Sequence, residues 1–394
     1  MSLINEYINS GKGIVGLEKE LRQLIARYNR KRNTYLLVYS IACGKPIPDA
    51  RVVQEDYFII HDLLHNCSQK GKSLDVYLET PGGSGETAEE IVEFLHSTFD
   101  PVTFVISGEA KSAGTIMALS GNEIMMTDTG SLGPIDAQMN IGRSWFSAYD
   151  YLEWVNEKHR EAAEKGCLNP FDATMVAQIT PGELRRVFNA QEFAKEKVAK
   201  WLTTYKFANW SETQTRKILV TENMKQEAAD KITAGIADHS RWKSHGKSIK
   251  RQDLDALGLR VSRIEDDPDL ADIVRRIQTV LRMLYMSGPH FKVFATEHEK
   301  IVRLAMVQGS PLIQGPPIKS VPAIEIEPQC NRCGLRHKLY VKFVKDSRID
   351  EDFKKRGVLP FPQDSRMKCS CGAEIDVSGL KNLLEVQAGR RIII

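Results

Sequence analysis

The stretch Val-Tyr-Leu-Glu-Thr-Pro-Gly-Gly-Ser-Gly at residues 76–85 runs from an apolar strand pattern into a glycine turn. A second stretch, Val-Ile-Ser-Gly-Glu-Ala-Lys-Ser-Ala-Gly-Thr at residues 105–115, repeats that design. An amphipathic helix pattern follows each turn, and helix starts carry unpaired N–H groups at a positive dipole end. Two such starts can hold a developing oxyanion, and Ser112 at the second one is placed as a nucleophile.

Around these turns the chain alternates between strand and helix patterns, which predicts an α/β fold with a parallel sheet and right-handed crossovers. The predicted strands lie at residues 34–41, 74–79, 102–107 and 123–127. The predicted helices lie at residues 16–32, 53–67, 85–98, 112–121, 150–166, 180–217, 222–237 and 268–286.

Three motifs in order carry a resemblance to a known superfamily: Pro81-Gly82-Gly83, residues 110–115 and Gly-Ser-Leu-Gly-Pro-Ile-Asp at residues 130–136. They resemble the Clp protease proteolytic subunit and signal peptide peptidase A superfamily, and most of all its serine dehydrogenase proteinase family. The resemblance covers residues 34–307 and includes a later segment at residues 241–249. It implies a ClpP/crotonase-like spiral of ββα units with helical additions. It also implies a homo-oligomeric serine peptidase that acts on peptides or unfolded protein.

The resemblance assigns roles to three residues of the glycine turns. Ser112 is the expected nucleophile, and the N–H groups of Gly83 and Ala113 are the expected oxyanion donors. The alternative for Ser112 is a purely structural one, because serine is a common helix N-cap.

The general base is harder to assign, because residues 130–138 contain no histidine where Clp subunits carry theirs. In related Ser-Lys peptidases the base is a lysine well beyond the serine, which points to Lys158 and, less closely, to Lys165. Such a lysine must be neutral, so its pKa must be lowered by burial. His245 is the rival, since histidine needs no large pKa shift to act as a base. Asp136 is suited to orient either base, and the Ser-Lys dyad is the favoured prediction.

Four of the seven cysteines form two close pairs near the end of the chain: Cys330, Cys333, Cys369 and Cys371. A glycine follows each pair, as in the knuckles that wrap a tetrahedral metal ion with four thiolates. We therefore predict a small zinc ribbon with a structural Zn²⁺, for which the four cysteines suffice and His337 is a candidate substitute ligand. Residues 321–394 hold 14 Lys/Arg against 10 Asp/Glu, which favours a protein-docking role over nucleic-acid binding.

Composition and punctuation predict the domain organisation of the 394-residue chain. An N-terminal amphipathic helix (residues 1–33) precedes the peptidase domain (34–307), a Pro-rich linker (308–320) and the ribbon (321–394). An apolar share of 42% and a charged share of 27% are typical of soluble globular proteins. The sequence shows neither an apolar run of membrane-spanning length nor a signal-peptide pattern, so we expect a cytoplasmic protein.

Two other function classes compete with the peptidase. One is a non-catalytic scaffold whose ribbon binds protein or nucleic acid. The other is acyl-CoA chemistry, because crotonases share the fold and the two-amide oxyanion hole. Crotonases typically polarise a thioester without a serine nucleophile, so Ser112 argues against the second alternative.

Overall fold

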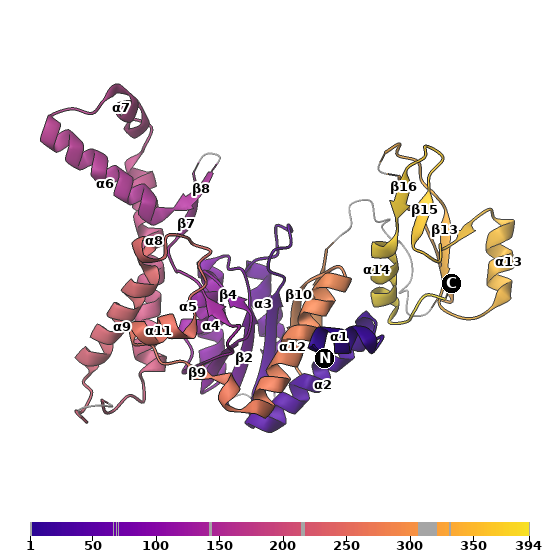
Figure 1. The fold of residues 1–394 in the computed structure, drawn as a ribbon, viewed down its shortest axis with the longest axis horizontal. Helices are drawn as coiled ribbons and strands as arrows, with labels where there is room; N and C mark the ends of the chain where they lie inside the picture. Colours follow the sequence, from indigo (N-terminus) through magenta and orange to yellow (C-terminus); the bar gives the residue numbers. More distant parts are fainter. Residues whose placement is uncertain are drawn as a thin grey trace. The chain divides into compact units, whose positions relative to one another are not determined.

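A computed structural model describes residues 2–65, 67, 69, 71–141, 144–213, 217–305, 321–330 and 332–393 (Figure 1). The chain divides into two compact units. The larger comprises Ile25–Arg275 and Val293–Ile301; the smaller comprises Met1–Leu24, Arg276–Lys292 and Val302–Ile394. The predicted Pro-rich linker at 308–320 lies outside the described residues. The predicted domain boundaries remain predictions.

The main sheet has seven strands in the order β11-β10-β1-β2-β3-β5-β9. Its strands are β1 (Tyr35–Ile41), β2 (Leu74–Glu79), β3 (Val102–Ile106), β5 (Glu123–Met126), β9 (Ser262–Arg263), β10 (His290–Ala295) and β11 (Lys300–Leu304). Adjacent strands from β1 through β9 pair in parallel. Every residue of β1, β2 and β3 is buried, as expected for a parallel sheet covered on both faces. The predicted α/β class is therefore confirmed.

A second, narrower layer of strand pairing lies just beyond the carboxyl ends of the main strands. It contains β4 (Glu109–Ala110) paired in parallel with β6 (Ser131–Leu132). Single bridges extend the layer, from Val52 to Gly83, from Thr80 to Ala110 and from Leu132 to Ile249. Each central strand thus turns into a short second strand before its helix begins. This repeat of strand, short strand and helix is the predicted ββα unit.

Helices cover the main sheet and extend from it. In the larger unit they are α3 (Gln54–His65), α4 (Gly85–Thr98), α5 (Ala113–Leu119), α6 (Ala148–Lys165), α7 (Pro170–Val176), α8 (Pro181–Trp201), α9 (Glu222–Ala237), α10 (His239–Trp242) and α11 (Arg251–Leu257). The helix predicted over 180–217 is too long, because α8 ends at Trp201 and a π-helical turn, η1, covers Leu202–Lys206. Helices α6 to α9 form a lobe next to a hairpin of β7 (Gln138–Ile141) and β8 (Ser144–Ser147) (Figure 1).

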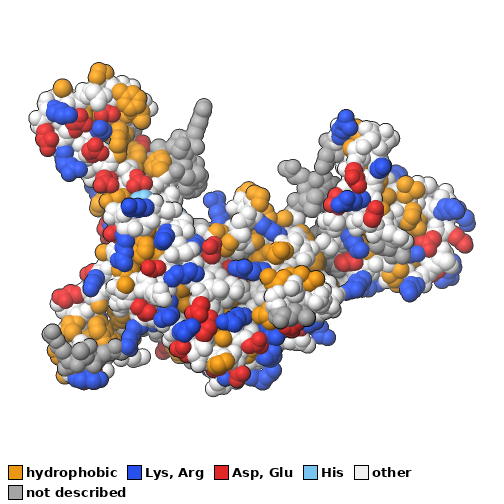
Figure 2. All heavy atoms as spheres, in the orientation of Figure 1, with side chains coloured by type: hydrophobic (Ala, Val, Ile, Leu, Met, Phe, Trp, Pro, Cys, Tyr) orange, Lys and Arg blue, Asp and Glu red, His pale blue; other side chains and the backbone are white. Residues whose placement is uncertain are grey.

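Two further helices carry residues of both units, α2 (Ile14–Arg32) and α12 (Pro268–Ser287), and a 3-10 turn, η2 (Ile264–Asp266), precedes α12. The smaller unit also contains α1 (Leu3–Asn9). Among the described residues, no helix has the length and apolar character that a membrane span needs. Basic and acidic side chains are interspersed over the visible face in Figure 2, in keeping with a net charge of only +3.

The C-terminal part of the smaller unit is built from short strands and two helices. Strands β12 (Ala323–Ile326), β13 (Leu339–Lys342) and β14 (Leu359–Pro360) form one sheet, and β15 (Arg366–Lys368) pairs with β16 (Glu374–Asp376). The helices are α13 (Ser347–Lys355) and α14 (Ser378–Ala388). A compact apolar core holds the sheet to α14, with Leu339, Val341, Phe361 and Leu384 buried in it.

Candidate active site and metal centre

Ser112 lies at the sharp turn between β4 and α5. Its backbone has φ 49° and ψ −115°, and a positive φ is rare for a residue with a side chain. Its side chain makes no capping hydrogen bond to α5. The structural alternative, a serine that caps its helix, is therefore not what the chain adopts. Strain of this kind gathers at functional sites, where the surrounding structure holds it.

The glycines of both turns are required by close packing with their surroundings. Gly82 has φ +107°, and a Cβ there would lie 2.7 Å from the Ser112 Cβ. Gly83 has φ +148°, and a Cβ there would lie 2.3 Å from the Val52 carbonyl oxygen. Gly114 has the same role on the other side, because a Cβ would meet Thr80 Cγ2 at 2.4 Å. Gly82 and Gly114 therefore allow the two turns to pack closely against each other.

Two backbone N–H groups remain available at this meeting point. Among the described residues, neither the Gly83 N–H nor the Ala113 N–H donates to a protein acceptor. The neighbouring donors are engaged: the Gly82 N–H donates to Thr80 Oγ1 at 3.1 Å and the Gly114 N–H to the Lys111 carbonyl at 2.8 Å. The structure thus leaves free the same two donors that the resemblance assigns to an oxyanion hole.

Both turns line one large cavity of ≈1330 Å³ in the larger unit. Gly83, Ser112 and Ala113 line it, and so do Asp136 and His245. One face of α8 also lines it, through residues spaced at helical intervals from Gly182 to Ala194. This cavity therefore brings together four of the six predicted catalytic and oxyanion residues: Gly83, Ser112, Ala113 and His245. Asp136 lines it as well, whereas Lys158 and Lys165 do not.

Asp136 and two histidines form a hydrogen-bonded group at this cavity. His245 Nδ1 lies 2.8 Å from Asp136 Oδ1, and His239 Nδ1 lies 3.1 Å from Asp136 Oδ2. Burial by itself would raise the pKa of Asp136, but the hydrogen bonds and charges of His245 and His239 outweigh it and lower that pKa. His245 Nε2 has no hydrogen-bond partner among the described residues. A ring held at Nδ1 by an ionised carboxylate and open at Nε2 can accept a proton from a neighbouring hydroxyl.

The two predicted lysines lie elsewhere, on α6. Lys158 Nζ forms ion pairs with Asp172 at 2.9 Å and Glu161 at 3.1 Å, and neither it nor Lys165 is among the residues that line the Ser112 cavity. The carboxylates of Asp172 and Glu161 raise the pKa of Lys158. A base must be neutral, so these contacts run against the favoured Ser-Lys prediction. Lys165 pairs with Glu161 in the same way, at 2.9 Å.

The lysine nearest the nucleophile in sequence, Lys111, has a structural position. Its buried Nζ donates to the carbonyls of Leu132 and Lys247 and to Ser248 Oγ, at 3.1, 3.0 and 2.9 Å. Burial lowers the pKa of Lys111. These contacts join the Ser112 turn to the segment that carries His245. Sequence analysis missed this residue, although its place directly beside the nucleophile was a signal for it.

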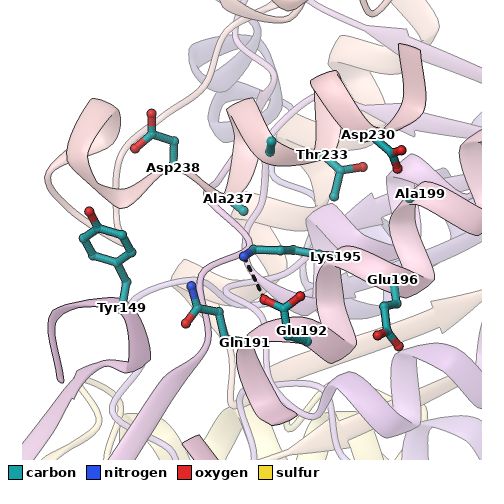
Figure 3. Close-up of a pocket in the computed structure, with 11 residues that line it drawn as sticks. Tyr149, Gln191, Glu192, Lys195, Glu196, Ala199, Asp230, Thr233, Ala237 and Asp238 are labelled. Carbon is teal, nitrogen blue, oxygen red and sulfur yellow. Dashed lines mark hydrogen bonds and ion pairs between the residues drawn. The ribbon is translucent and has the colours of Figure 1, made fainter. Parts of the chain in front are cut away.

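His239 and a second cavity were also missed. His239 Nε2 lies 3.2 Å from Asp150, so its ring bridges Asp136 to the start of α6. A smaller cavity of ≈380 Å³ lies between α8 and α9 and shares no lining residue with the larger one. Lys195 and Glu192 form an ion pair at its centre, and Thr233 and Asp238 face it from the other side (Figure 3).

The cysteines form a cluster in the smaller unit, with their four Sγ atoms within 4.8 Å of one another. The Sγ atoms of Cys330 and Cys371 lie 3.7 Å apart, and those of Cys333 and Cys369 lie 3.5 Å apart. Four thiolates around Zn²⁺ at about 2.3 Å place their sulfurs about 3.8 Å apart, so the donor set fits a tetrahedral ion. His337 is not part of this cluster.

The two halves of the cluster have the same local design. The Gly334 N–H donates to the Cys330 carbonyl, and the Gly372 N–H to the Cys369 carbonyl, at 2.8 and 2.9 Å. Both glycines have positive φ, +76° and +83°, which a tight turn here requires. Two equivalent knuckles therefore present four thiols to one point, and the predicted metal-binding arrangement can hold a metal ion.

Comparison with known proteins finds a family similarity within the larger unit. A family model of the ClpP-like SDH-type serine proteinases matches residues 60–209. The predicted resemblance is confirmed. The matched residues include β2, β3, both glycine turns, Ser112 and Asp136, whereas His245 and the cysteine cluster lie beyond them. The match to the ClpP-like SDH-type serine proteinases supports a peptidase function.

Curated relatives match only part of their own length. Uncharacterized protein MJ0137 of Methanocaldococcus jannaschii is 33% identical over 95 residues, which is 24% of this chain and 32% of that protein. Uncharacterized protein MJ1495 of the same organism is 33% identical over 92 residues, or 23% and 30% of the two chains. The chain thus spans about a third of the length of the curated relatives it matches.

Solved structures with partial similarity include two of one protease. A mutant of the 1510-N membrane-bound stomatin-specific protease has 12% identity and TM-score 0.30, covering 57% of this chain and 79% of that chain. Another mutant of that protease, in complex with a substrate peptide, has 16% identity and TM-score 0.20, covering 57% and 89%.

Proposed function

We propose that this protein is a serine peptidase in which Ser112 is the nucleophile, His245 the general base and Asp136 the group that orients the base. The observation that carries the proposal is the shared cavity: the strained Ser112 turn, two unengaged N–H donors and a histidine held by a buried carboxylate all line it. The ClpP-like serine proteinase match supports the same reaction class.

The proposed reaction follows the chemistry of acyl transfer. Ser112 Oγ attacks the peptide carbonyl carbon as its proton passes to His245 Nε2, and the carbonyl oxygen becomes an oxyanion held by the N–H groups of Gly83 and Ala113. The C–N bond then breaks, and His245 gives the proton to the leaving amine. Water, deprotonated by His245, attacks the acyl-enzyme and releases the carboxylic acid and Ser112. Asp136 stays ionised throughout and stabilises the histidine when it is protonated.

His245 replaces the lysine favoured from sequence because of where each side chain lies. Lys158 is tied to two carboxylates that keep it charged. His245 lines the same cavity as Ser112 and has its Nε2 open. Active-site labelling of variants separates the two assignments.

The proposed substrates are peptides or unfolded protein, bound as an added strand along the Gly82–Gly83 backbone. Among the described residues, the strand pairing of Gly83 is limited to an isolated bridge with Val52, so this edge has main-chain groups to offer. Strand addition supplies affinity through main-chain hydrogen bonds, with side-chain pockets giving selectivity. A homo-oligomer and a cytoplasmic location remain part of this proposal.

For the cysteine cluster we propose a structural Zn²⁺ held by Cys330, Cys333, Cys369 and Cys371. When bound, a structural zinc ion links the two knuckles and supplies folding free energy to a domain with a small core. All four ligand positions are then occupied by protein, so the ion has no catalytic role. The ribbon is proposed to dock a protein partner rather than nucleic acid.

The decisive experiment is labelling of the full-length, metal-loaded protein with a fluorophosphonate probe, with the adduct located by mass spectrometry. We expect one adduct, on Ser112, that is absent in Ser112→Ala. We also expect it to be strongly reduced in His245→Ala but retained in Lys158→Ala, since only His245 is proposed to activate the hydroxyl.

Ser84→Ala is a matched control, because Ser84 also lines the cavity but caps α4 through its hydroxyl. Its labelling should equal that of the wild type. Labelling lost in Lys158→Ala and retained in His245→Ala, with both variants folded, would reinstate the Ser-Lys dyad. No labelling between pH 6 and pH 9 would favour the non-catalytic scaffold.

A further inference from the structure

The walls of the Ser112 cavity carry an unbalanced set of charges. Three arginines line it, Arg51, Arg185 and Arg186. The acidic residues that line it are Glu86 and Asp136. Asp136 is already held by two histidines, and Glu86 accepts a hydrogen bond from Ser84 Oγ at 3.0 Å. The cavity therefore presents a surplus of positive charge to whatever enters it.

In the described part of the chain, the three arginines have no acidic partner that would neutralise their charge. Among the described residues, none of the three forms an ion pair, and Arg185 has only a contact with the Phe188 ring at 6.0 Å. By contrast, Arg263 and Lys197 on the same unit pair with Asp128 and Glu89. All three cavity arginines are exposed and free to reach a ligand.

The three arginines come from two separate segments that line the cavity together with Ser112. Arg51 directly precedes Val52, whose backbone pairs with the oxyanion residue Gly83. Arg185 and Arg186 lie on the face of α8 that also presents Phe193 and Ala194 to the cavity. A peptide that lies along the Gly83 edge of this cavity would therefore meet guanidinium groups as well as the apolar residues of α8.

We propose that this cavity selects acidic peptides: segments with Asp or Glu side chains flanking an apolar residue at the bond to be cut. The proposal rests on the proposed serine peptidase function and names its substrate class. Guanidinium groups pair with carboxylates through two parallel hydrogen bonds, which gives orientation as well as attraction. Phe193 and Ile116, which also line the cavity, provide apolar surface for the residue between the acidic ones.

The test compares three fluorogenic peptides of equal length and identical apolar core, flanked by Glu, Gln or Lys. For the full-length protein at low salt we expect kcat/KM to be highest for the Glu peptide, lower for the Gln peptide and lowest for the Lys peptide. Arg185→Gln and Arg186→Gln should each lower kcat/KM for the Glu peptide by about fivefold, the upper end for exposed ion pairs. The charge swap Arg185→Glu with Arg186→Glu should turn the preference toward the Lys peptide. Raising salt should shrink all these differences.

Arg160→Gln is the matched control, since it removes the same charge from an exposed position on α6 outside the cavity. It should leave the peptide order unchanged. Binding of the same peptides to Ser112→Ala, followed by fluorescence anisotropy, tests selectivity without any cleavage. Fluorophosphonate labelling of Ser112 reports separately on the proposed function.

Equal use of the three peptides by a protein that labels at Ser112 would overturn the acidic selectivity and leave the peptidase standing. No labelling, together with equal binding of the three peptides to Ser112→Ala, would remove both. Single-stranded oligonucleotide that binds more tightly than the Glu peptide, with the same dependence on the three arginines, would overturn the proposal in favour of a nucleic-acid ligand.

Discussion

The serine site and the cysteine cluster are both built on pairs of glycine turns, yet they depend on the rest of the chain very differently. In the cluster, each turn brings two ligands together within two or three residues, as in Cys369 and Cys371. In the serine site, each segment contributes one group, from Gly83 and Ser112 to Asp136 and His245. The first arrangement is largely local, and the second exists only when the ββα spiral has formed.

This difference predicts how each site fails. Loss of a cysteine ligand or of the metal should disrupt the cluster, whereas substitutions at the serine site should leave it intact. The serine site should respond to single atoms at Ser112 and His245 and be indifferent to the metal. Four experiments test or refine that separation, from the largest expected effect to the smallest.

Ser112→Ala should have the largest effect. We expect peptidase activity to fall by at least about ten thousandfold, because Ser112 Oγ is the group proposed to form the acyl-enzyme. Metal content and melting temperature should stay unchanged. Steady-state cleavage together with metal analysis of the same sample measures both. Residual activity within tenfold of the wild type would remove Ser112 from the mechanism.

His245→Ala and Lys158→Ala should differ sharply. The first should reduce kcat by about a thousandfold, since proton transfer from the hydroxyl is lost. The second should change kcat by less than about threefold, because Lys158 pairs with Asp172 and Glu161 away from the cavity. Rates at saturating peptide decide between them, with circular dichroism confirming that both variants fold. The reverse order would restore the lysine prediction.

Cys369→Ser should break the cluster alone. Loss of an outer-shell partner already weakens metal binding by 10- to 100-fold, so removal of a direct ligand should cost at least about a hundredfold in affinity. Protease sensitivity should then increase within residues 321–394, with fluorophosphonate labelling of Ser112 retained. Labelling that disappears together with the metal would show that the two sites are coupled.

The smallest expected effect concerns the pH dependence of stability, which we assign in part to His96 in the larger unit. Burial lowers the pKa of His96 to about 4, and the ring stacks on Tyr205. The unfolded chain takes up a proton at its ordinary, higher pKa. Stability contributed by neutral His96 is therefore complete above about pH 6.5 and lost as the pH falls toward 4.

His96→Phe keeps the ring and removes the titration. It should reduce the loss of unfolding free energy of the larger unit between pH 6.5 and pH 4 by on the order of 2 kcal/mol. Denaturant unfolding at the two pH values measures this change. The cysteine cluster should release its metal on acidification in both proteins, because thiolates protonate. An equal loss of unfolding free energy in the wild type and in His96→Phe between the two pH values would contradict the assignment to His96.

Much of the fold could be predicted because its signals are local. The strand at 74–79 and the helices at 85–98 and 222–237 have the predicted bounds, since apolar periodicity and turn residues mark both ends. The helix predicted over 180–217 is longer than α8, because no glycine or proline marks the point where α8 becomes a π-helical turn. The two-residue strands β4 and β6 carry no periodicity at all, and only pairing defines them.

The sequence by itself determined the two glycine turns, the serine between them and the four cysteines, because each is a short pattern with a steric or chemical requirement of its own. Only the tertiary structure decided which distant side chains join them. It brought His245 and Asp136 to the Ser112 cavity and kept Lys158 in ion pairs elsewhere. The physical reason is that a base is defined by proximity and pKa, and both are properties of packing rather than of sequence spacing.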